Sequence, residues 1–256
     1  KNKNLKSVLI TGGAARLGRH LALTLADMGW MVHLHYHTKA ADAEDVMHLI
    51  HQSGGSCTLH QADLADAGAA ETLMRDISYH DGQMALINNA SLFELDTAQD
   101  VSAEMMARHM AVNAIAPAVM IKAFAAKVKP LFPATRGAVI NITDAKLSGL
   151  NPDYYSYTVS KMALDGLTTI AAQAYAPYLR VNGVAPGIML RSGDQTQAEY
   201  EIAHRRNPLG QGAQLEDISR SVIMILDTMA MTGHTVTIDG GLHLRPPNRD
   251  VAFLDE

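Results

Sequence analysis

The chain has 256 residues, of which 48% are hydrophobic and 18% are charged, and its formal net charge is -5 at pH 7. This length and composition are typical of one globular α/β domain, and they exclude a disordered or fibrous chain. The negative charge gives no broad basic surface, so nucleic acid and anionic membrane are not expected as partners. We therefore expect a small-molecule ligand.

Cysteine content and hydropathy indicate the compartment. Cys57 is the only cysteine, so no intrachain disulfide can form, as is usual for a protein of a reducing compartment. No apolar run approaches the roughly 18 residues of a membrane span, and SVLI after the basic start is too short for the apolar core of a signal sequence. We therefore expect a cytoplasmic protein.

Short β-branched runs alternate with longer helical patterns along the chain. Strands are expected at 5–10, 31–36, 56–61, 84–90, 137–143, 178–186 and 234–239. One helix is expected to begin near residue 16, a second to end at residue 50 and a third to begin at residue 66. Further helices are expected over 102–129, around the YTVSK stretch, over 198–206 and over 215–231. Such alternation predicts one Rossmann-type doubly wound α/β domain with a seven-stranded parallel sheet and helices on both faces. This domain would cover residues 1–245, with a tail at 246–256.

Polar or glycine-rich segments follow five of these strands. They are TGGAARLG (11–18), Asp63, NNAS (88–91), TDAK (143–146) and APGIML (185–190). Because ligands of an open parallel sheet bind beyond the carboxyl ends of its strands, we expect these segments to line one site.

The segment 11–18 predicts a dinucleotide cofactor. Glycines between a strand and a helix allow the backbone to approach a pyrophosphate, and the helix start supplies amide donors; a plain turn is the alternative. The second strand ends in HYHTK, without the acid that binds the ribose diol of NAD. Lys39 and His37 would instead meet a 2'-phosphate, with Thr38 donating a hydrogen bond, so NADPH is expected.

The alternating histidines of the second strand raise the possibility of a metal site. His33, His35 and His37 would share one face of a strand. No cysteine or carboxylate cluster lies near them in sequence, so no metal is expected. The remaining histidines are expected at the surface or on helix faces, with no role; they include His48, His51, His60, His80 and His109.

Tyr157 and Lys161 lie one helical turn apart, so their side chains would project from one face. A nearby cation lowers the pKa of a phenol and prepares it for proton transfer. The same spacing is common on ordinary solvated helices, so the pair needs support from the rest of the chain.

Several motifs together make the chain resemble the short-chain dehydrogenase/reductases over nearly its whole length. They are TGGAARLG, NNAS, VNAIAP (112–117), YTVSK, APG and TIDGG (237–241). Two positions depart from that family's pattern: Arg16 stands where its middle glycine usually lies, and Asp144 stands in place of its catalytic serine. These departures, with HYH and NNASLF, resemble the pteridine reductases and dihydromonapterin reductases.

The resemblance implies roles for individual residues. Tyr157 would transfer a proton, and Lys161 would lower the pKa of Tyr157 and bind the nicotinamide ribose. Asn113 would hold a helix irregularity and a water that links Lys161 to solvent. Asp144 would pass a proton through Tyr157 toward a ring nitrogen, and Phe93 would stack on the pterin. Asp63 and Leu64 would flank adenine, and Asn89 and Ala90 would line the adenosine ribose. The other implied cofactor-binding residues are Gly12, Arg16, Leu17, Gly18, His37, Thr38, Lys39, Tyr157, Lys161, Pro186 and Gly187. The implied substrate-binding residues are Arg16, Ser91, Phe93, Asp144 and Tyr157.

Residue chemistry agrees with that resemblance. A carbonyl reductase donates hydrogen bonds to a developing alkoxide, which an ionised Asp144 would repel. A pterin instead needs a proton on a ring nitrogen while hydride reaches the neighbouring carbon. Simpler interpretations remain open: Asp144 as a turn cap, Phe93 as a core residue and Arg16 as a solvent-facing helix start.

The first hypothesis is an NADPH-dependent reductase of a dihydropterin, such as dihydrobiopterin or dihydromonapterin, or of dihydrofolate. The alternatives are a carbonyl reductase, such as a 3-oxoacyl carrier-protein reductase or a sugar or steroid dehydrogenase, and a regulator that senses NADPH without turnover. The resemblance also implies a homotetramer assembled through helix 102–129 and the Tyr157 helix, and a mobile substrate loop at 188–197.

Overall fold

The computed structural model describes residues 6–79, 82–134, 136–191, 196–250 and 253. Seven strands form one sheet in the order β3-β2-β1-β4-β5-β6-β7, and every neighbouring pair is parallel. The strands are β1 (Lys6–Ile10), β2 (Trp30–Tyr36), β3 (Ser56–Gln61), β4 (Met84–Asn88), β5 (Gly137–Ile142), β6 (Leu179–Pro186) and β7 (Thr235–Ile238). The predicted doubly wound sheet is confirmed.

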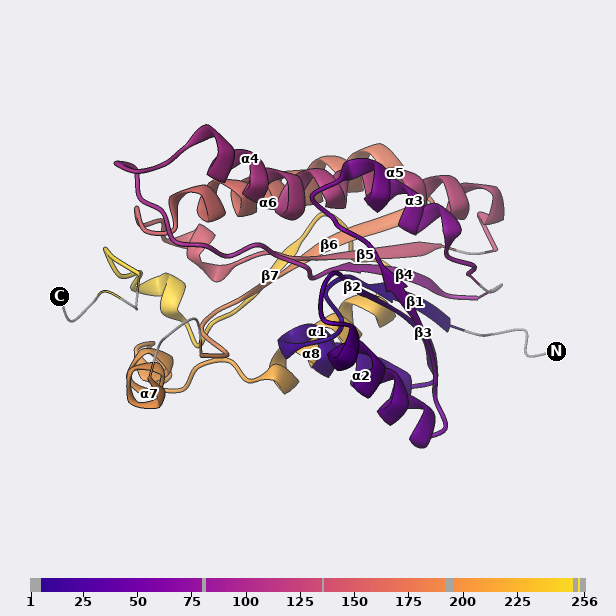
Figure 1. Cartoon of the computed structure of the whole chain (residues 1–256), viewed down its shortest axis with the longest axis horizontal. Coiled ribbons are helices and arrows are strands. Elements are labelled where there is room, and N and C mark those ends of the chain that lie inside the picture. Colours follow the sequence, from indigo (N-terminus) through magenta and orange to yellow (C-terminus); the bar gives the residue numbers. More distant parts are fainter. Residues whose placement is uncertain (1–5, 80–81, 135, 192–195, 251–252, 254–256) are drawn as a thin grey trace.

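Helices cover both faces of the sheet (Figure 1). One layer contains α1 (Arg16–Asp27), α2 (Ala40–Gln52) and α8 (Leu215–Asp227), and the other contains α3 (Ala67–Asp76), α4 (Ala103–Met110), α5 (Ala116–Val128) and α6 (Tyr155–Tyr175). The short α7 (Gln197–Arg205) lies beyond the carboxyl ends of the strands, on the same side as the end of the chain. Among the described residues, 3-10 turns lie at Lys129–Leu131, Ala145–Ser148 and Leu242–Leu244.

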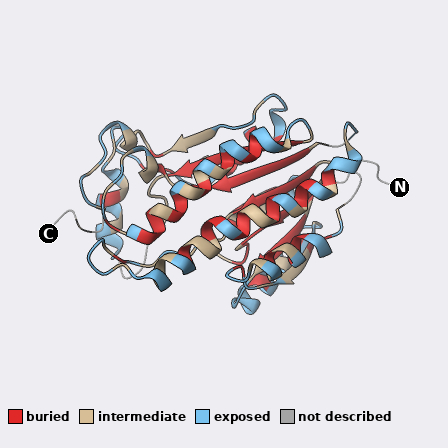
Figure 2. Cartoon of the chain, turned by 90° about the horizontal axis from the view of Figure 1, so that it is seen from above, coloured by how far each residue is buried: buried red, intermediate tan, exposed pale blue. Residues whose placement is uncertain are grey.

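The buried strands explain the unbroken apolar runs of the sequence. Side chains alternate between the faces, so Val8 and Ile10 pack in the core beneath α1 and α8, whereas Leu9 packs in the core beneath α3 and α5. All residues of β4 and β6 are buried, as expected for strands covered on both faces. Figure 2 shows the buried sheet between helices whose outer faces are exposed.

The predicted helix 102–129 is a continuous helical run with an irregular centre. A π-helical segment, Ala111–Ile115, joins α4 to α5 and contains Asn113. By length and mean hydropathy the run Ala103–Leu131 could cross a membrane, although Asn113 and Lys122 interrupt its apolar residues. Half of its apolar window is buried, because α5 packs on α3 and the sheet while α4 packs on α6. The core of the fold therefore explains its apolar character.

Strand order reverses between β1 and β4, which lie side by side at the middle of the sheet. In open parallel sheets this reversal opens a crevice outside the carboxyl ends of the strands, where ligands bind. The segments predicted to form the site all start at that edge, and α7 and the Leu242–Leu244 turn lie beside it (Figure 1).

Candidate active site

One cavity of about 1260 Å³ lies at this edge of the sheet. It exceeds the roughly 300–1,000 Å³ of typical small-molecule sites, so a cofactor and a substrate can share it. Every predicted site residue except Asn113 lines it, namely Gly12, Arg16, Leu17, Gly18, His37, Thr38, Lys39, Asp63, Leu64, Asn89, Ala90, Ser91, Phe93, Asp144, Tyr157, Lys161, Pro186 and Gly187.

The glycine turn after β1 is packed so closely that side chains are excluded. Gly12 has a left-handed φ of 63°, and a Cβ on Gly18 would lie 2.1 Å from the carbonyl oxygen of Gly12. Asn89 ties the turn to the end of β4, because its Nδ2 donates to the carbonyl oxygens of Thr11 and Gly12 at 2.9 and 3.2 Å. The start of α1 is thus held open to a phosphate group.

His35 is a site residue that the sequence interpretation missed. Its Nδ1 accepts a hydrogen bond from the Gly12 amide at 3.1 Å, and its Nε2 lies 3.1 Å from the carbonyl oxygen of Ala62. These two partners require the neutral ring, with the proton on Nε2. Burial lowers the pKa of His35 to about 4, so the ring stays neutral at physiological pH and supports the glycine turn from below. The alternating histidines of this strand did not indicate the contact between His35 and Gly12.

Arg16 reaches across the cavity mouth. It begins α1 with a left-handed φ of 52°, a conformation that glycine adopts without strain, which is consistent with its place at the usual position of a glycine. Its Nη1 donates to the carbonyl oxygen of Arg191, in the segment after β6, at 3.0 Å. The side chain therefore points over the site, and its role with phosphate or substrate stays a prediction.

The cations expected at a 2'-phosphate follow β2 at the exposed end of the cavity. His37 lies 3.9 Å from Asp63, and Lys39 lies 3.9 Å from Asp42. Both contacts are long and solvent-exposed, so they cost little to break when a phosphate competes. Thr38 lies between them in the cavity wall.

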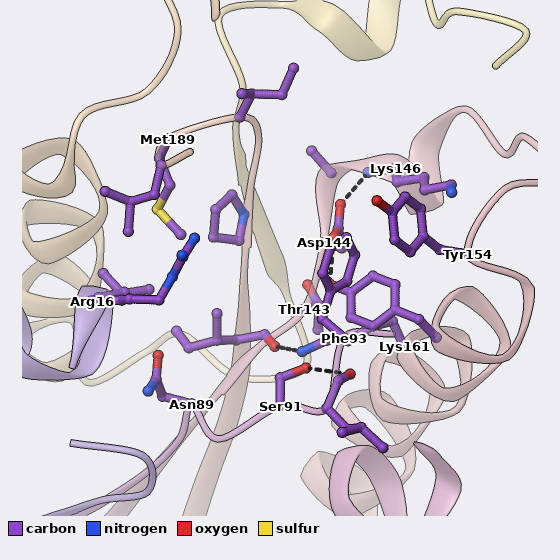
Figure 3. A pocket seen from close by; sticks show the side chains of 18 of the residues that line it. Arg16, Asn89, Ser91, Phe93, Thr143, Asp144, Lys146, Tyr154, Lys161 and Met189 are labelled. Carbon is purple, nitrogen blue, oxygen red and sulfur yellow. Dashed lines mark hydrogen bonds between the residues drawn. The ribbon is translucent and has the colours of Figure 1, made fainter. Parts of the chain in front are cut away.

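Asp144 and Tyr157 are hydrogen-bonded to each other. Tyr157 donates its hydroxyl to Oδ2 of Asp144 at 2.6 Å, while the other oxygen of Asp144 accepts from the Lys146 amide at 2.8 Å. The carboxylate therefore both caps the turn after β5 and holds the phenol, which accommodates the two interpretations weighed from the sequence. Figure 3 shows Asp144 across the cavity from Arg16.

The pKa of Tyr157 lies above its usual value in this structure, so the lowering expected from Lys161 stays a prediction. Burial, first, and then the negative charge of Asp144 raise the pKa of Tyr157 well above its usual value. Lys161 lies 5.7 Å from the centre of the phenol ring and donates to the carbonyl oxygen of Ile142 at 2.8 Å. Burial lowers the pKa of Lys161 to about 8. Tyr157 is thus a protonated phenol at neutral pH.

Asn113 lies behind the cavity wall and fixes the segment after β4. Its Oδ1 accepts from the Leu92 amide at 2.7 Å, and its Nδ2 donates to the Leu92 carbonyl and to Ser160 at 2.9 Å each. The π-helical segment turns this side chain inward. Its clearest effect is to position the neighbouring Ser91 and Phe93; the predicted link through water to Lys161 stays a prediction.

Phe93 stands at the cavity surface, with 43% of its area exposed, so it is not a core residue. Its ring lies edge-on to Tyr157 at 4.7 Å and stacks on Tyr154 at 4.3 Å between ring centres. Tyr154 is a second residue that the sequence interpretation missed; it has a left-handed φ of 50° and precedes α6. The rings form an aromatic wall beside Asp144 (Figure 3).

Two buried residues hold this region in place. The carboxylate of Asp96 accepts from the amide and the hydroxyl of Ser156 and so caps the start of the helix that carries Tyr157. His109, expected at the surface or on a helix face without a role, is fully buried: it bonds the Met105 carbonyl at 3.0 Å and the Glu94 amide at 3.3 Å. His109 therefore lies on a helix, as expected, but it is buried and has a structural role, because the segment after β4 folds over α4.

The segment after β6 is tied to α7. Tyr200 donates to the carbonyl oxygen of Met189 at 3.0 Å, and His204 lies 2.8 Å from that of Ile188. Of the predicted substrate loop, residues 192–195 lie outside the described residues, as does His80. The loop's mobility stays a prediction.

The histidines of β2 are not arranged around a metal. His33 contacts Thr58 at 2.9 Å and His60 at 3.2 Å, whereas His35 faces the glycine turn. Within the described part of the chain, no group of three or more histidine, cysteine or acidic side chains could hold a metal ion.

This fold, with a phenol and a buried lysine beside an open glycine turn, is that of a dinucleotide-dependent oxidoreductase. A family model described as enoyl-(acyl carrier protein) reductase matches residues 13–243, and pteridine reductase 1 of Leishmania tarentolae is 33% identical over 92% of the chain and 96% of its own length. The chain belongs to the short-chain dehydrogenase/reductase family.

The chain is also similar to two reductases that act on different substrates by name. The alternative dihydrofolate reductase 1 (FolM) of Brucella canis, solved in complex with NADP, is 34% identical, with a TM-score of 0.88 over 98% of this chain and 99% of that one. The 3-oxoacyl-[acyl-carrier-protein] reductase FabG of Staphylococcus aureus is 28% identical over 94% of this chain and 100% of its own length.

Proposed function

We propose that this oxidoreductase uses NADPH to reduce a dihydropterin. The hydrogen bond of 2.6 Å between Tyr157 and Asp144, beside the exposed ring of Phe93, is the observation that carries the proposal. The NADP of the Brucella canis relative and the pteridine reductase of Leishmania tarentolae support the same cofactor and ring system.

The glycine turn fits the pyrophosphate of the cofactor. A Cβ on Gly18 would collide with the Gly12 carbonyl, so the backbone there is exposed in a way that only glycine permits. His37, Thr38 and Lys39 would hold the 2'-phosphate, and Lys161 would hold the nicotinamide ribose. Bound NADPH supplies hydride to the ring carbon next to the nitrogen that receives the proton.

Tyr157 and Asp144 would supply that proton. Phe93 holds the flat heterocycle by stacking, and the Tyr157 hydroxyl gives its proton to the ring nitrogen. Asp144 orients the hydroxyl, and the phenol is recharged with a proton from solvent through this carboxyl group. A raised pKa suits this direction, because Tyr157 carries its proton at neutral pH.

A carbonyl reductase is the second candidate, supported by the similarity to FabG. Its chemistry places negative charge on a carbonyl oxygen, and the Asp144 carboxylate would repel that charge where a hydroxyl group would stabilise it. Asp144 therefore favours the pterin over the thioester substrate.

The test is NADPH oxidation measured in parallel with dihydrobiopterin, dihydromonapterin, dihydrofolate and an acetoacetyl thioester. Turnover of one or more pterins with little or no turnover of the thioester is expected. Turnover of the thioester alone would overturn the proposal. The same preparation, run with NADH, checks the cofactor; sedimentation and cell fractionation check the expected homotetramer and cytoplasmic location.

A further inference from the structure

Four charged side chains meet at the end of the cavity beyond Tyr154, and the proposed chemistry uses none of them. Lys146 and Asp153 belong to the segment between β5 and α6, and Arg249 and Asp250 belong to the C-terminal tail. Arg249 Nε donates to both oxygens of Asp153 at 3.0 and 2.9 Å, and the Asp250 amide donates to the same carboxylate at 2.6 Å. Lys146 Nζ donates to the Asp153 carbonyl and lies 3.8 Å from Oδ2 of Asp250.

Three of these charged side chains are largely buried, whereas that of Arg249 is 49% exposed. The side chains of Lys146 and Asp250 are 10% and 22% exposed, and that of Asp153 is 4% exposed. Buried charges are costly unless they are paired, so the cluster specifies one arrangement of the tail. Burial lowers the pKa of Lys146, while Asp250 is the first of the charges that oppose this effect.

The tail thereby becomes a wall of the cavity. Pro246 packs against Gly149 so closely that a Cβ on Gly149 would lie 2.1 Å from it. The ring of Phe253 lies 6.2 Å from that of Tyr154, which in turn stacks on Phe93. The part of the cavity lining that surrounds the cluster comprises Lys146, Gly149, Tyr154, Pro246, Asp250 and Phe253.

The chemistry of a 7,8-dihydropterin indicates which part of it would meet this wall. Its reducible C=N bond joins N5 to C6, and C6 carries the side chain. With the proton delivered to N5 by Tyr157 and Asp144, that side chain leaves the ring beside this pair. Lys146 lies two residues beyond Asp144 and bonds its carboxylate through the backbone amide, and Tyr154 lies three residues before Tyr157. Figure 3 shows Asp144, Lys146 and Tyr154 on the same side of the cavity.

We propose that Lys146 and Asp250 form a subsite for a hydroxyl-bearing side chain on C6 of the pterin, and that the site prefers such a side chain to the p-aminobenzoyl-glutamate of a folate. The 3.8 Å between Nζ and Oδ2 is too long for a hydrogen bond, but a hydroxyl group can accept from the ammonium and donate to the carboxylate. A folate instead brings an aromatic ring that desolvates both charges without offering them a hydrogen-bond partner. This inference rests on the proposed function.

The test compares substrates that differ only at C6. We would measure kcat/KM for a trihydroxypropyl dihydropterin, 6-methyl-7,8-dihydropterin and 7,8-dihydrofolate. For Lys146→Met and Asp250→Asn, kcat/KM should fall about tenfold or more with the trihydroxypropyl substrate and stay within about threefold with the 6-methyl substrate. Asp250→Asn should also gain on dihydrofolate. Lys146→Arg should retain most of the preference, and Glu44→Gln, an exposed acid on α2, is the matched control.

Three outcomes would overturn the subsite: an equal loss on all three substrates, unchanged selectivity in both variants, or a wild-type protein that prefers dihydrofolate to the trihydroxypropyl substrate. Dissociation constants for NADPH show whether each variant is folded; should Lys146→Met not bind NADPH, Asp250→Asn decides alone. Failure of the proposed function is distinguishable, because the wild-type protein would then turn over none of the three substrates.

Discussion

The cofactor half and the substrate half of the cavity are held together by different kinds of contact. At the ends of β1, β2 and β4, the glycine turn is fixed by backbone groups, by the Asn89 amide and by the neutral ring of His35. At the ends of β4 and β5, charged groups from separate segments hold the site, including Asp144, Asp96 and Asp250. The first half depends on close approach, and the second on charges placed by distant parts of the chain.

Substitutions in the two halves should change different properties of the enzyme. A site built on backbone contacts loses affinity when its packing is disturbed, but it leaves the chemistry intact. A charged site loses chemistry or selectivity while the cofactor still binds. Substitutions in the two halves should therefore separate NADPH affinity from turnover.

The largest effect is expected for Tyr157→Phe in the substrate half. The phenyl ring keeps its packing against Phe93, but the proton donor is lost and Asp144 loses its hydrogen-bond partner. We expect kcat with a dihydropterin to fall about 10²–10⁴-fold, and the dissociation constant of NADPH to change by less than about threefold. Stopped-flow NADPH oxidation and fluorescence titration measure the two quantities. Turnover within tenfold of the wild-type rate would exclude Tyr157 as the proton donor.

A smaller effect of the opposite kind is expected for His35→Leu in the cofactor half. The Gly12 amide loses its acceptor, so the dissociation constant of NADPH should rise about tenfold while kcat at saturating NADPH changes little. Titration with NADPH at pH 7.5 measures this. A large fall in kcat with unchanged affinity would contradict the assignment of His35 to the glycine turn.

His35 also gives a pH signature. Its pKa is lowered from 6.5 to about 4 in the folded chain, so between these values the unfolded chain binds a proton that the folded chain does not. The contribution of His35 to the free energy of unfolding should therefore be fully present above pH 6.5. The free energy should then fall by about 3 kcal/mol as the pH drops to 4. Urea melts of wild-type and His35→Leu protein at several pH values measure it, and parallel curves for the two proteins would contradict it.

The smallest effect is expected for Asp96→Ala, which removes the cap of α6. Loss of a helix cap costs about 1–2 kcal/mol, and each kcal/mol lowers Tm by about 2–4 °C in a chain of this size. Affinity for NADPH should not change, because the cap lies on the substrate side. Asp45→Ala, at an exposed position of α2, is the control, and equal melting temperatures for the two variants would show that Asp96 does not stabilise α6.

The two halves also differed in how far the sequence could predict them. The glycine turn and the strand ends around it are local patterns, so their place beside β1 and β4 could be predicted from spacing alone. His35, Asp96 and His109 could not, because their partners lie 23, 60 and 15 residues away and neither composition nor periodicity marks such contacts.

The electrostatic surroundings of Tyr157 and Lys146 could be predicted only in part from the sequence. Asp144 and Tyr157 were expected together on the strength of a resemblance, and they are hydrogen-bonded. The sign of the effect on the phenol was not foreseen, because burial and a neighbouring carboxylate outweigh a lysine 5.7 Å away. The contact of Asp250 with Lys146 joins residues 104 positions apart, and only the folded tail brings them together.

The central claim, that Asp144 commits this site to a pterin, is tested most directly by Asp144→Ser. The ratio of kcat/KM for 7,8-dihydrobiopterin to that for an acetoacetyl thioester should fall at least 100-fold in this variant, because a hydroxyl group is a far weaker acid than a carboxyl group and a poorer proton source for Tyr157, but it can stabilise an alkoxide. An unchanged ratio would contradict the account.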